Sequence, residues 1–221
     1  MTDKKIFIIN GSPRKNWNTD KMCQSFADGA KSKGVEAEII YLYDLNFKGC
    51  RSCFACKLKG GKNFSRCAYP DDLTPILDRV IQADGLVIAS PIYCSDITGM
   101  TRCFIERLTF PLFQYEEGYP SSAPKRFPVA IITTMNVNEE LCETMYKDLF
   151  EKMDWIIGNA FTKPVHIRAC DTYQFSDYDK YAASVFDKNH KINQRDVELP
   201  KALEKAFQAG KNMIKTINNG E

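Results

Sequence analysis

The chain has 221 residues, of which 44% are hydrophobic and 26% charged, and its 30 Lys and Arg against 28 Asp and Glu give a net charge of +2. This balance offers no electrostatic reason to expect a nucleic-acid or membrane partner. No apolar run reaches membrane-spanning length, and residues 1–5 lack the apolar stretch of a signal peptide, so we expect a cytoplasmic protein.

Apolar runs that read as buried strands alternate along the chain with helical patterns. The first run, 5–10, ends at Gly11-Ser12-Pro13, and the helical pattern that follows ends at Gly34. The strands are expected at 5–10, 35–43, 85–90, 127–134 and 161–167, and the helices at 18–32, 73–81, 98–112, 138–155 and 199–217. Asp71 and Asp72 are expected to cap the second helix, and Pro164 suits an edge strand.

This alternation predicts a doubly wound α/β fold with helices on both faces of a five-stranded parallel sheet. Right-handed crossovers make 2-1-3-4-5 the simplest strand order. We expect residues 1–221 to form a single domain with two irregular stretches, 113–126 and 170–197. The second is polar and Tyr-rich, and its length indicates a functional flap, a partner contact or a flexible segment.

The loop after the first strand has the composition of an anion site. Ser12, Arg14, Asn18 and Thr19 surround the start of a helix, whose free N–H groups and dipole attract negative charge. A phosphomonoester would fit there. The loop has neither the Gly-Lys-Ser/Thr of a P-loop nor the spacing of Gly-x-Gly-x-x-Gly. The structural alternative is that Asn18 or Thr19 only caps its own helix.

In a sheet of this order, ligands bind beyond the carboxyl ends of strands 1 and 3, so the loop after the third strand belongs to the same candidate site. It reads "SPIYCSDITGMTRCFIERL". Tyr93 is an aromatic side chain that could stack on a flat ring, Ser95 and Thr98 add hydroxyls, and Gly99 permits close backbone approach.

Together, "GSPRKNWNT" and "ASPIYCSDITGMTRCFIERL" resemble the flavodoxin-like NAD(P)H-dependent FMN reductases, whose motifs read G-S-P-R-x-x-x-N-T and S-P-x-Y followed by a helix start. The resemblance covers about the first 155 residues. It implies a flavodoxin-like three-layer sandwich, FMN as cofactor, NAD(P)H as co-substrate, and a homodimer or homotetramer. Trp17 stands where that family frequently has Gly, and its indole either covers the phosphate or tilts the loop.

The resemblance also implies which residues bind the cofactor. The phosphate would be held by the first loop and the isoalloxazine and ribityl by the loops after the third and fourth strands. The implied cofactor-binding residues are Ser12, Arg14, Asn18, Thr19, Pro91, Ile92, Tyr93, Cys94, Ser95, Thr98, Thr134 and Met135. No protein side chain is expected to act as a catalytic acid or base, because the flavin carries the redox chemistry.

Four of the nine cysteines, Cys50, Cys53, Cys56 and Cys67, cluster after the second strand. The C-x2-C-x2-C run resembles the iron-sulfur flavoproteins, a sister group, although ten residues separate Cys56 from Cys67, more than is usual there. The main expectation is a cysteine-rich loop without metal. The alternatives are a [4Fe–4S] cluster on these four residues, a zinc site or a redox disulfide. Nearby Lys57, Lys59, Lys62 and Arg66 are expected to lower the thiol pKa values.

The predicted function is transfer of hydride from NAD(P)H through FMN to a small acceptor such as a quinone or free flavin. The alternative is an electron-transfer flavoprotein with FMN and a [4Fe–4S] cluster that does not itself bind nicotinamide. A third interpretation is a scaffold that has lost its cofactor. His166 and His190 are the only histidines, which argues against a hydrolytic triad, and His166 is expected to be structural.

Overall fold

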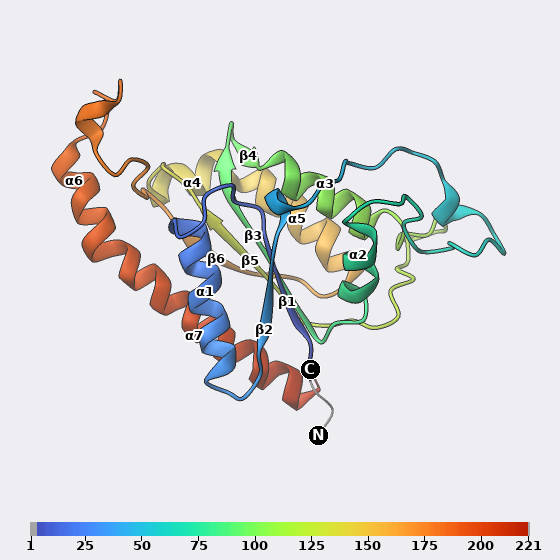
Figure 1. Cartoon of the computed structure of the whole chain (residues 1–221). Helices are drawn as coiled ribbons and strands as arrows, with labels where there is room; N and C mark the ends of the chain where they lie inside the picture. The colour runs from blue at the N-terminus through green and yellow to red at the C-terminus, as the bar shows by residue number, and fades with distance from the viewer. Residues whose placement is uncertain (1–3, 221) are drawn as a thin grey trace.

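The computed structural model describes residues 4–220 and contains one sheet of six strands. The main strands are parallel in the order β2-β1-β3-β5-β6, which confirms the predicted flavodoxin-like order 2-1-3-4-5 (Figure 1). Their bounds are β1 Ile6–Asn10, β2 Ala37–Tyr41, β3 Gly85–Tyr93, β5 Val129–Thr134 and β6 Val165–Ala169. Across residues 4–220, no helix combines the length and apolarity that crossing a membrane requires.

The sixth strand, β4 (Asp96–Ile97), was not predicted. It pairs antiparallel with the end of β3, and the two are joined by Cys94 and Ser95, which have φ values of 49° and 63°. Two consecutive residues with positive φ are what a tight two-residue hairpin turn requires. Strand β3 is therefore longer than expected, because it runs on past Ser90 into this hairpin.

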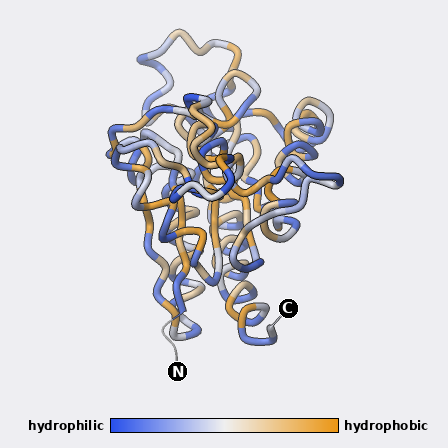
Figure 2. Tube along the Cα trace, turned by 90° about the vertical axis from the view of Figure 1, so that its right-hand side faces the viewer, coloured by the Kyte–Doolittle hydropathy of each residue, from blue (hydrophilic) through white to orange (hydrophobic). Residues whose placement is uncertain are grey.

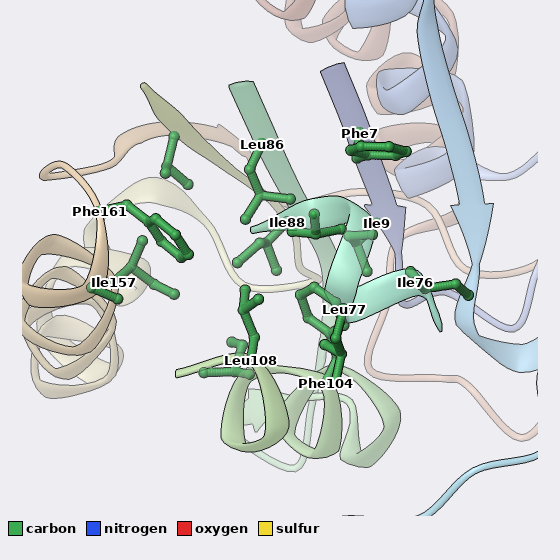
Figure 3. Packing of buried hydrophobic residues seen from close by; sticks show 14 of the residues in the cluster. Phe7, Ile9, Ile76, Leu77, Leu86, Ile88, Phe104, Leu108, Ile157 and Phe161 are labelled. Carbon is green, nitrogen blue, oxygen red and sulfur yellow. The ribbon is translucent and has the colours of Figure 1, made fainter. Parts of the chain in front are cut away.

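Helices cover both faces of the sheet. One face carries α1 (Asn18–Lys31) and α7 (Leu199–Asn219), which pack against each other and against the sheet. The other carries α2 (Thr74–Val80), α3 (Gly99–Thr109) and α5 (Lys147–Ala160). Figure 3 shows this second core, where Leu77, Phe104 and Ile157 from the helices meet Ile9 and Ile88 of the strands. In Figure 2, the hydrophobic colouring gathers along the strands in the middle of the molecule.

Close backbone contact between α1 and α7 depends on two glycines. A Cβ on Gly29 would lie 2.0 Å from the carbonyl oxygen of Phe207, and one on Gly210 would lie 2.2 Å from that of Phe26. Each glycine thus lets the opposing helix backbone come nearer than any side chain would permit. The outcome is a tightly held first helix, whose N-terminus lies at the edge of the sheet where β1 and β3 end.

Several predicted boundaries were wrong. The helix expected at 138–155 is two helices, α4 (Glu139–Met145) and α5, because Tyr146 between them leaves helical geometry at φ −113° and ψ 10°. The strand expected at 35–43 ends at Tyr41 and gives way to a 3-10 turn, Leu42–Asp44. Pro164 does not interrupt the last strand but precedes it, and β6 is an edge strand as expected.

The stretch 170–197 contains short helical pieces. They are a 3-10 turn (Tyr178–Lys180), α6 (Lys188–Asn193) and a π-helical turn (Gln194–Glu198) that leads directly into α7. Figure 1 shows α6 standing off the sheet beyond α1 and α4. The cysteine-bearing stretch between β2 and α2 lies on the other side of the molecule, beside α2 and α3.

Candidate functional site

The carboxyl ends of β1, β3 and β5 meet at one pocket. Its cavity of about 50 Å³ is lined by the loop after β1, by the end of β3, by the start of the loop after β5 and by a segment following β6. The lining residues are Ser12, Arg14, Trp17, Asn18, Thr19, Pro91, Ile92, Tyr93, Thr134, Met135, Asn136, Thr172, Tyr173 and Gln174. Nine of the twelve residues that the sequence analysis assigned to the cofactor site are among them.

Cys94, Ser95 and Thr98 do not line this pocket. Cys94 and Ser95 form the exposed hairpin turn between β3 and β4. Thr98 is buried and caps α3, since its Oγ1 accepts a hydrogen bond from the Thr101 N–H and lies 2.8 Å from the carbonyl oxygen of Gly11, to which it donates. The role of Thr98 is structural, because its hydrogen bond to Gly11 connects the start of α3 to the loop after β1.

The loop after β1 is shaped by a buried carboxylate. Asp20, 2% exposed, accepts hydrogen bonds from Asn10 Nδ2 at 2.9 Å and from the Asn16 N–H at 2.6 Å. The Asn10 Oδ1 atom in turn accepts from the Ser12 N–H at 2.9 Å. This chain of contacts curls residues 10–20 around the start of α1 and fixes where the Ser12 hydroxyl lies.

In the part of the chain that the structure describes, no side chain caps α1. Its N-cap position is Trp17, and Asn18 and Thr19 are already inside the first turn, so the structural alternative that one of them caps the helix is wrong. An indole cannot accept a hydrogen bond from the first-turn N–H groups in the way that Ser or Asp does. Those groups and the positive end of the helix dipole are therefore available to an anion.

The hydroxyls in the pocket keep hydrogens free for donation. Ser12 Oγ accepts from the Arg14 N–H at 3.2 Å, which leaves its own hydrogen available. Thr19 Oγ1 and Thr134 Oγ1 lie 2.7 Å apart and share one hydrogen, so the second hydrogen of that pair is free. This first-loop end of the pocket thus holds several donors and the Arg14 guanidinium, a set suited to a phosphate.

Tyr93 offers an aromatic surface at the other end. Tyr93 is 44% exposed. Burial raises the pKa of its phenol, the charge of Arg14 opposes this rise, and Tyr43 adds a smaller increase. The phenol is therefore neutral at neutral pH and can stack on a flat ring without adding charge. Met135, 3% exposed, lines the pocket from the end of β5.

The segment after β6 closes the pocket, and none of its residues was predicted to belong to the site. Thr172 donates to the carbonyl oxygen of Met135 through both its N–H and its Oγ1. Asn18 Nδ2 donates to the carbonyl oxygen of Tyr173 at 2.8 Å, and Arg14 Nη1 donates to that of Gln174 at 2.8 Å. The only sequence signal for this segment was the unusual length and Tyr content of 170–197.

A buried lysine of α6 holds this segment in place. Lys191, 3% exposed, donates from Nζ to Asn136 Oδ1 at 2.6 Å and pairs with the Asp171 carboxylate. Burial by itself would raise the pKa of Asp171, but hydrogen bonds from Lys191 and His190 lower it below its usual value. One ammonium therefore connects α6 to the loops that follow both β5 and β6.

The four clustered cysteines lie apart from this pocket and share a cavity of their own of about 20 Å³. Cys50 and Cys53 are exposed, Cys56 is buried and Cys67 is half-buried. Within residues 4–220, no three His, Cys, Asp or Glu side chains are arranged to hold a single metal ion. A cavity of this size has room for about one water molecule, so a four-iron cluster would require the loop to move outward.

At Cys56 the expected lowering of the thiol pKa by nearby basic residues does not prevail. Burial raises the pKa of Cys56, and Lys57 only partly opposes it. Lys57 Nζ points instead at main-chain carbonyls after α3, including that of Phe110 at 2.6 Å, and Arg66 pairs with Asp78. The neighbour of Cys67 is Arg107, whose Nε lies 3.3 Å from its Sγ.

His166 is structural, as expected. It lies in β6, outside the pocket, with Nε2 2.6 Å from Asp154 Oδ1 and its ring against Phe150.

The family model described as NADPH-dependent FMN reductase matches residues 4–156 of this chain. Among curated proteins, an iron-sulfur flavoprotein of Archaeoglobus fulgidus is 40% identical over 103 residues, which are 47% of this chain and 48% of that protein. An iron-sulfur flavoprotein of Methanosarcina thermophila is 29% identical over 103 residues, 47% of this chain and 51% of that protein. The chain thus spans about half the length of the curated relatives it matches.

Among solved structures, an NAD(P)H:quinone oxidoreductase from Methanothermobacter marburgensis superposes with a TM-score of 0.70 at 16% identity, over 96% of this chain and 100% of that one. An FMN-dependent NADH-azoreductase from Bacillus anthracis, solved with FMN, gives a TM-score of 0.65 at 15% identity, over 95% and 99% of the two chains. At these identities the likeness shows the fold. The match over residues 4–156, more than half of the sequence, shows that the chain belongs to the NADPH-dependent FMN reductase family.

Proposed function

We propose that this chain is an FMN-dependent oxidoreductase that passes hydride from NAD(P)H through the flavin to a small acceptor such as a quinone or free flavin. The observation that carries the proposal is the pocket at the carboxyl ends of β1 and β3, where the strand order reverses and this fold binds ligands. Its wall combines an uncapped helix start, free hydroxyl hydrogens and an exposed neutral aromatic ring.

Each part of the wall has a role in this proposal. Ser12, Asn18 and Thr19 with Arg14 would hold the phosphate, and the residues from Pro91 to Tyr93 would lie along the ring system. Bound FMN would supply the two-electron redox chemistry, so no side chain has to act as a base. The chain's own contribution is to bind and orient the cofactor and to cover it with the segment after β6.

The cavity of about 50 Å³ is smaller than a flavin, so the covering segment has to shift for the cofactor to enter. That segment rests on the first loop through the two hydrogen bonds from Asn18 and Arg14 to main-chain carbonyls. Such contacts on a loop are inexpensive to open compared with the packed helices beneath.

We also propose that residues 1–221 are one domain, that the protein acts in the cytoplasm, and that it assembles as a homodimer or homotetramer. One sheet with a hydrophobic core on each face supports the first point. The near-neutral charge balance supports a small-molecule acceptor over nucleic acid as partner.

The test is FMN binding by a double variant, Ser12→Ala with Thr19→Ala, measured by quenching of flavin fluorescence. Each lost hydrogen bond to a charged phosphate is worth about 1.5–3 kcal/mol, so affinity should fall by at least tenfold. The matched control is Ser32→Ala with Thr144→Ala, since these hydroxyls donate to helix carbonyls away from the pocket. Equal FMN affinity in both double variants would refute the phosphate assignment.

Anaerobic spectroscopy tests the activity. A flavin spectrum that NAD(P)H alone bleaches within seconds supports the reductase. Protein that is colourless and takes up no added FMN would instead indicate a scaffold without cofactor.

A second candidate function is an electron carrier with FMN and a [4Fe–4S] cluster, and one observation favours it. Cys67 lines the same cavity as Cys50, Cys53 and Cys56 although ten residues separate it from Cys56. Four thiols on one cavity are the donor set of such a cluster, and these four would hold it after the loop has moved outward. Anaerobically purified protein should then contain iron and acid-labile sulfide. Cys67→Ala should lose both, whereas Cys94→Ala, at an exposed turn away from the cavity, should keep them.

A further inference from the structure

At the rim of the pocket, the indole of Trp17 contacts both Arg14 and Tyr173, and this contact group is called the stack below. The Arg14 guanidinium lies 3.8 Å from the centroid of the indole ring, and the Tyr173 ring packs against it with centroids 4.9 Å apart. Tyr173 is 5% exposed and comes from the segment after β6. That segment lies beyond residues 4–156, so the stack joins the family's phosphate loop to a part of the chain that the family model does not cover.

Among residues 4–220, one polar atom of Trp17 and one of its neighbour Asn18 find no hydrogen-bond partner. Trp17 Nε1 and Asn18 Oδ1 are both buried and unpaired, and they belong to adjacent residues of the same pocket wall. Asn18 as a whole is 4% exposed, and its Nδ2 is already engaged with the carbonyl of Tyr173. A buried donor or acceptor left without a partner destabilises the fold, so native proteins rarely leave such atoms unsatisfied.

The two unpaired atoms have opposite requirements. The indole N–H can only donate, and the amide oxygen can only accept. A ligand that satisfies both must therefore carry an acceptor beside a donor. The phosphate end of flavin mononucleotide has this combination, because the phosphate oxygens accept and the hydroxyls of the adjoining polyol donate.

We propose that Trp17 Nε1 donates a hydrogen bond to the phosphate of the bound mononucleotide, and that Asn18 Oδ1 accepts one from a polyol hydroxyl. This inference rests on the proposed function and adds a residue that family comparison would pass over, since the family frequently has glycine at the position of Trp17. The indole is then a phosphate ligand, and its ring contacts the Arg14 guanidinium and the Tyr173 ring.

The rival explanation is a single water that bridges Nε1 and Oδ1. Water has the required donor and acceptor, and the cavity has room for it. The two explanations differ in one respect that can be measured: only the ligand explanation makes the indole N–H respond to the phosphate of the flavin.

The test compares FMN with riboflavin, which lacks the phosphate, on the full chain freed of flavin. Trp17→Phe keeps an aromatic ring in the stack and deletes the N–H. We expect its dissociation constant for FMN to rise at least tenfold while that for riboflavin stays within twofold. Trp155→Phe is the matched control, because Trp155 is 58% exposed on α5 and packs on Phe113 away from the pocket.

The wild-type protein provides a second measurement that does not depend on how the variant folds. The chain has two tryptophans, so a nitrogen–proton NMR spectrum contains two indole signals. FMN should move the Trp17 indole proton downfield and riboflavin should not, with the Trp155 signal unchanged by either.

If wild type binds FMN and Trp17→Phe binds it equally well, or loses FMN and riboflavin affinity alike, the inference is wrong and the proposed function stands. If the wild-type protein binds no FMN, both the role of Trp17 and the proposed FMN-dependent function are wrong.

Discussion

A buried ion pair between α3 and the cysteine-bearing stretch makes a prediction about stability. The Arg107 side chain is 1% exposed and that of Asp71 9% exposed, and the two form a two-pronged contact. Arg107 also donates to the carbonyl oxygens of Lys48 and Tyr69, at 3.1 and 3.3 Å. One guanidinium thereby fastens both ends of the stretch that carries Cys50 to Cys67.

Asp71→Asn should destabilise the protein by about 3–5 kcal/mol, because it leaves the Arg107 charge buried without a counter-ion. For a chain of this size that corresponds to a fall in Tm of about 6–20 °C. The Asn oxygen can still accept the N–H bonds of Leu73 and Thr74 that Asp71 accepts at the start of α2, so loss of the cap contributes little.

Thermal unfolding followed by circular dichroism measures the effect. Asp78→Asn is the control, because Asp78 pairs with Arg66 at side-chain exposures of 33% and 51%, and an exposed pair is worth about 0–1 kcal/mol. The double variant Asp71→Asn with Arg107→Met should recover much of the loss, since no buried charge remains. If Asp71→Asn and Asp78→Asn lower Tm equally, the reasoning is refuted.

The same pair sets a pH dependence. Burial alone would raise the pKa of Asp71, but the hydrogen bonds and charge of Arg107 bring it below its ordinary value. A carboxyl with a lowered pKa in the folded state stabilises the protein fully above its unfolded pKa of about 3.9, and this stabilisation is lost as the pH falls further. The acid limb of the Tm profile should therefore be shallower in Asp71→Asn than in wild type.

Three further predictions concern the helices and the thiols. Lys191→Met should make the 170–197 segment open to chymotrypsin, because the ammonium that joins α6 to the loops after β5 and β6 is lost; equal digestion of wild type would contradict this. Gly210→Ala should lower Tm markedly, since its Cβ would strike the α1 backbone, whereas Gly99→Ala, with open space around it, should not. Iodoacetamide at pH 7.5 should alkylate exposed Cys53 well before Cys170. Burial, and to a smaller extent the neighbouring Cys142, raises the pKa of the Cys170 thiol to about 12. Mass spectrometry of the modified peptides measures the order, and alkylation of Cys170 before Cys53 would contradict the prediction.

Local patterns in the sequence were enough to predict the fold class and the strand order. The alternation of apolar runs with helical periods predicted five parallel strands and their order, because buried parallel strands and their crossover helices follow a few steric rules. The same rules put the loops after the first, third and fourth predicted strands at one edge. The nine pocket residues that were anticipated all come from those loops.

The tertiary structure alone decided how the individual side chains are used. Cys94 and Ser95 form a hairpin turn, and Thr98 caps α3 instead of lining the pocket. The cause is that β3 continues into an antiparallel pair with β4, which no local sequence pattern predicted. Tyr173 reaches Trp17 across more than 150 residues of sequence. Periodicity encodes which face of an element is buried, whereas a contact between distant loops depends on where packing brings the whole chain, and no short stretch of sequence contains that information.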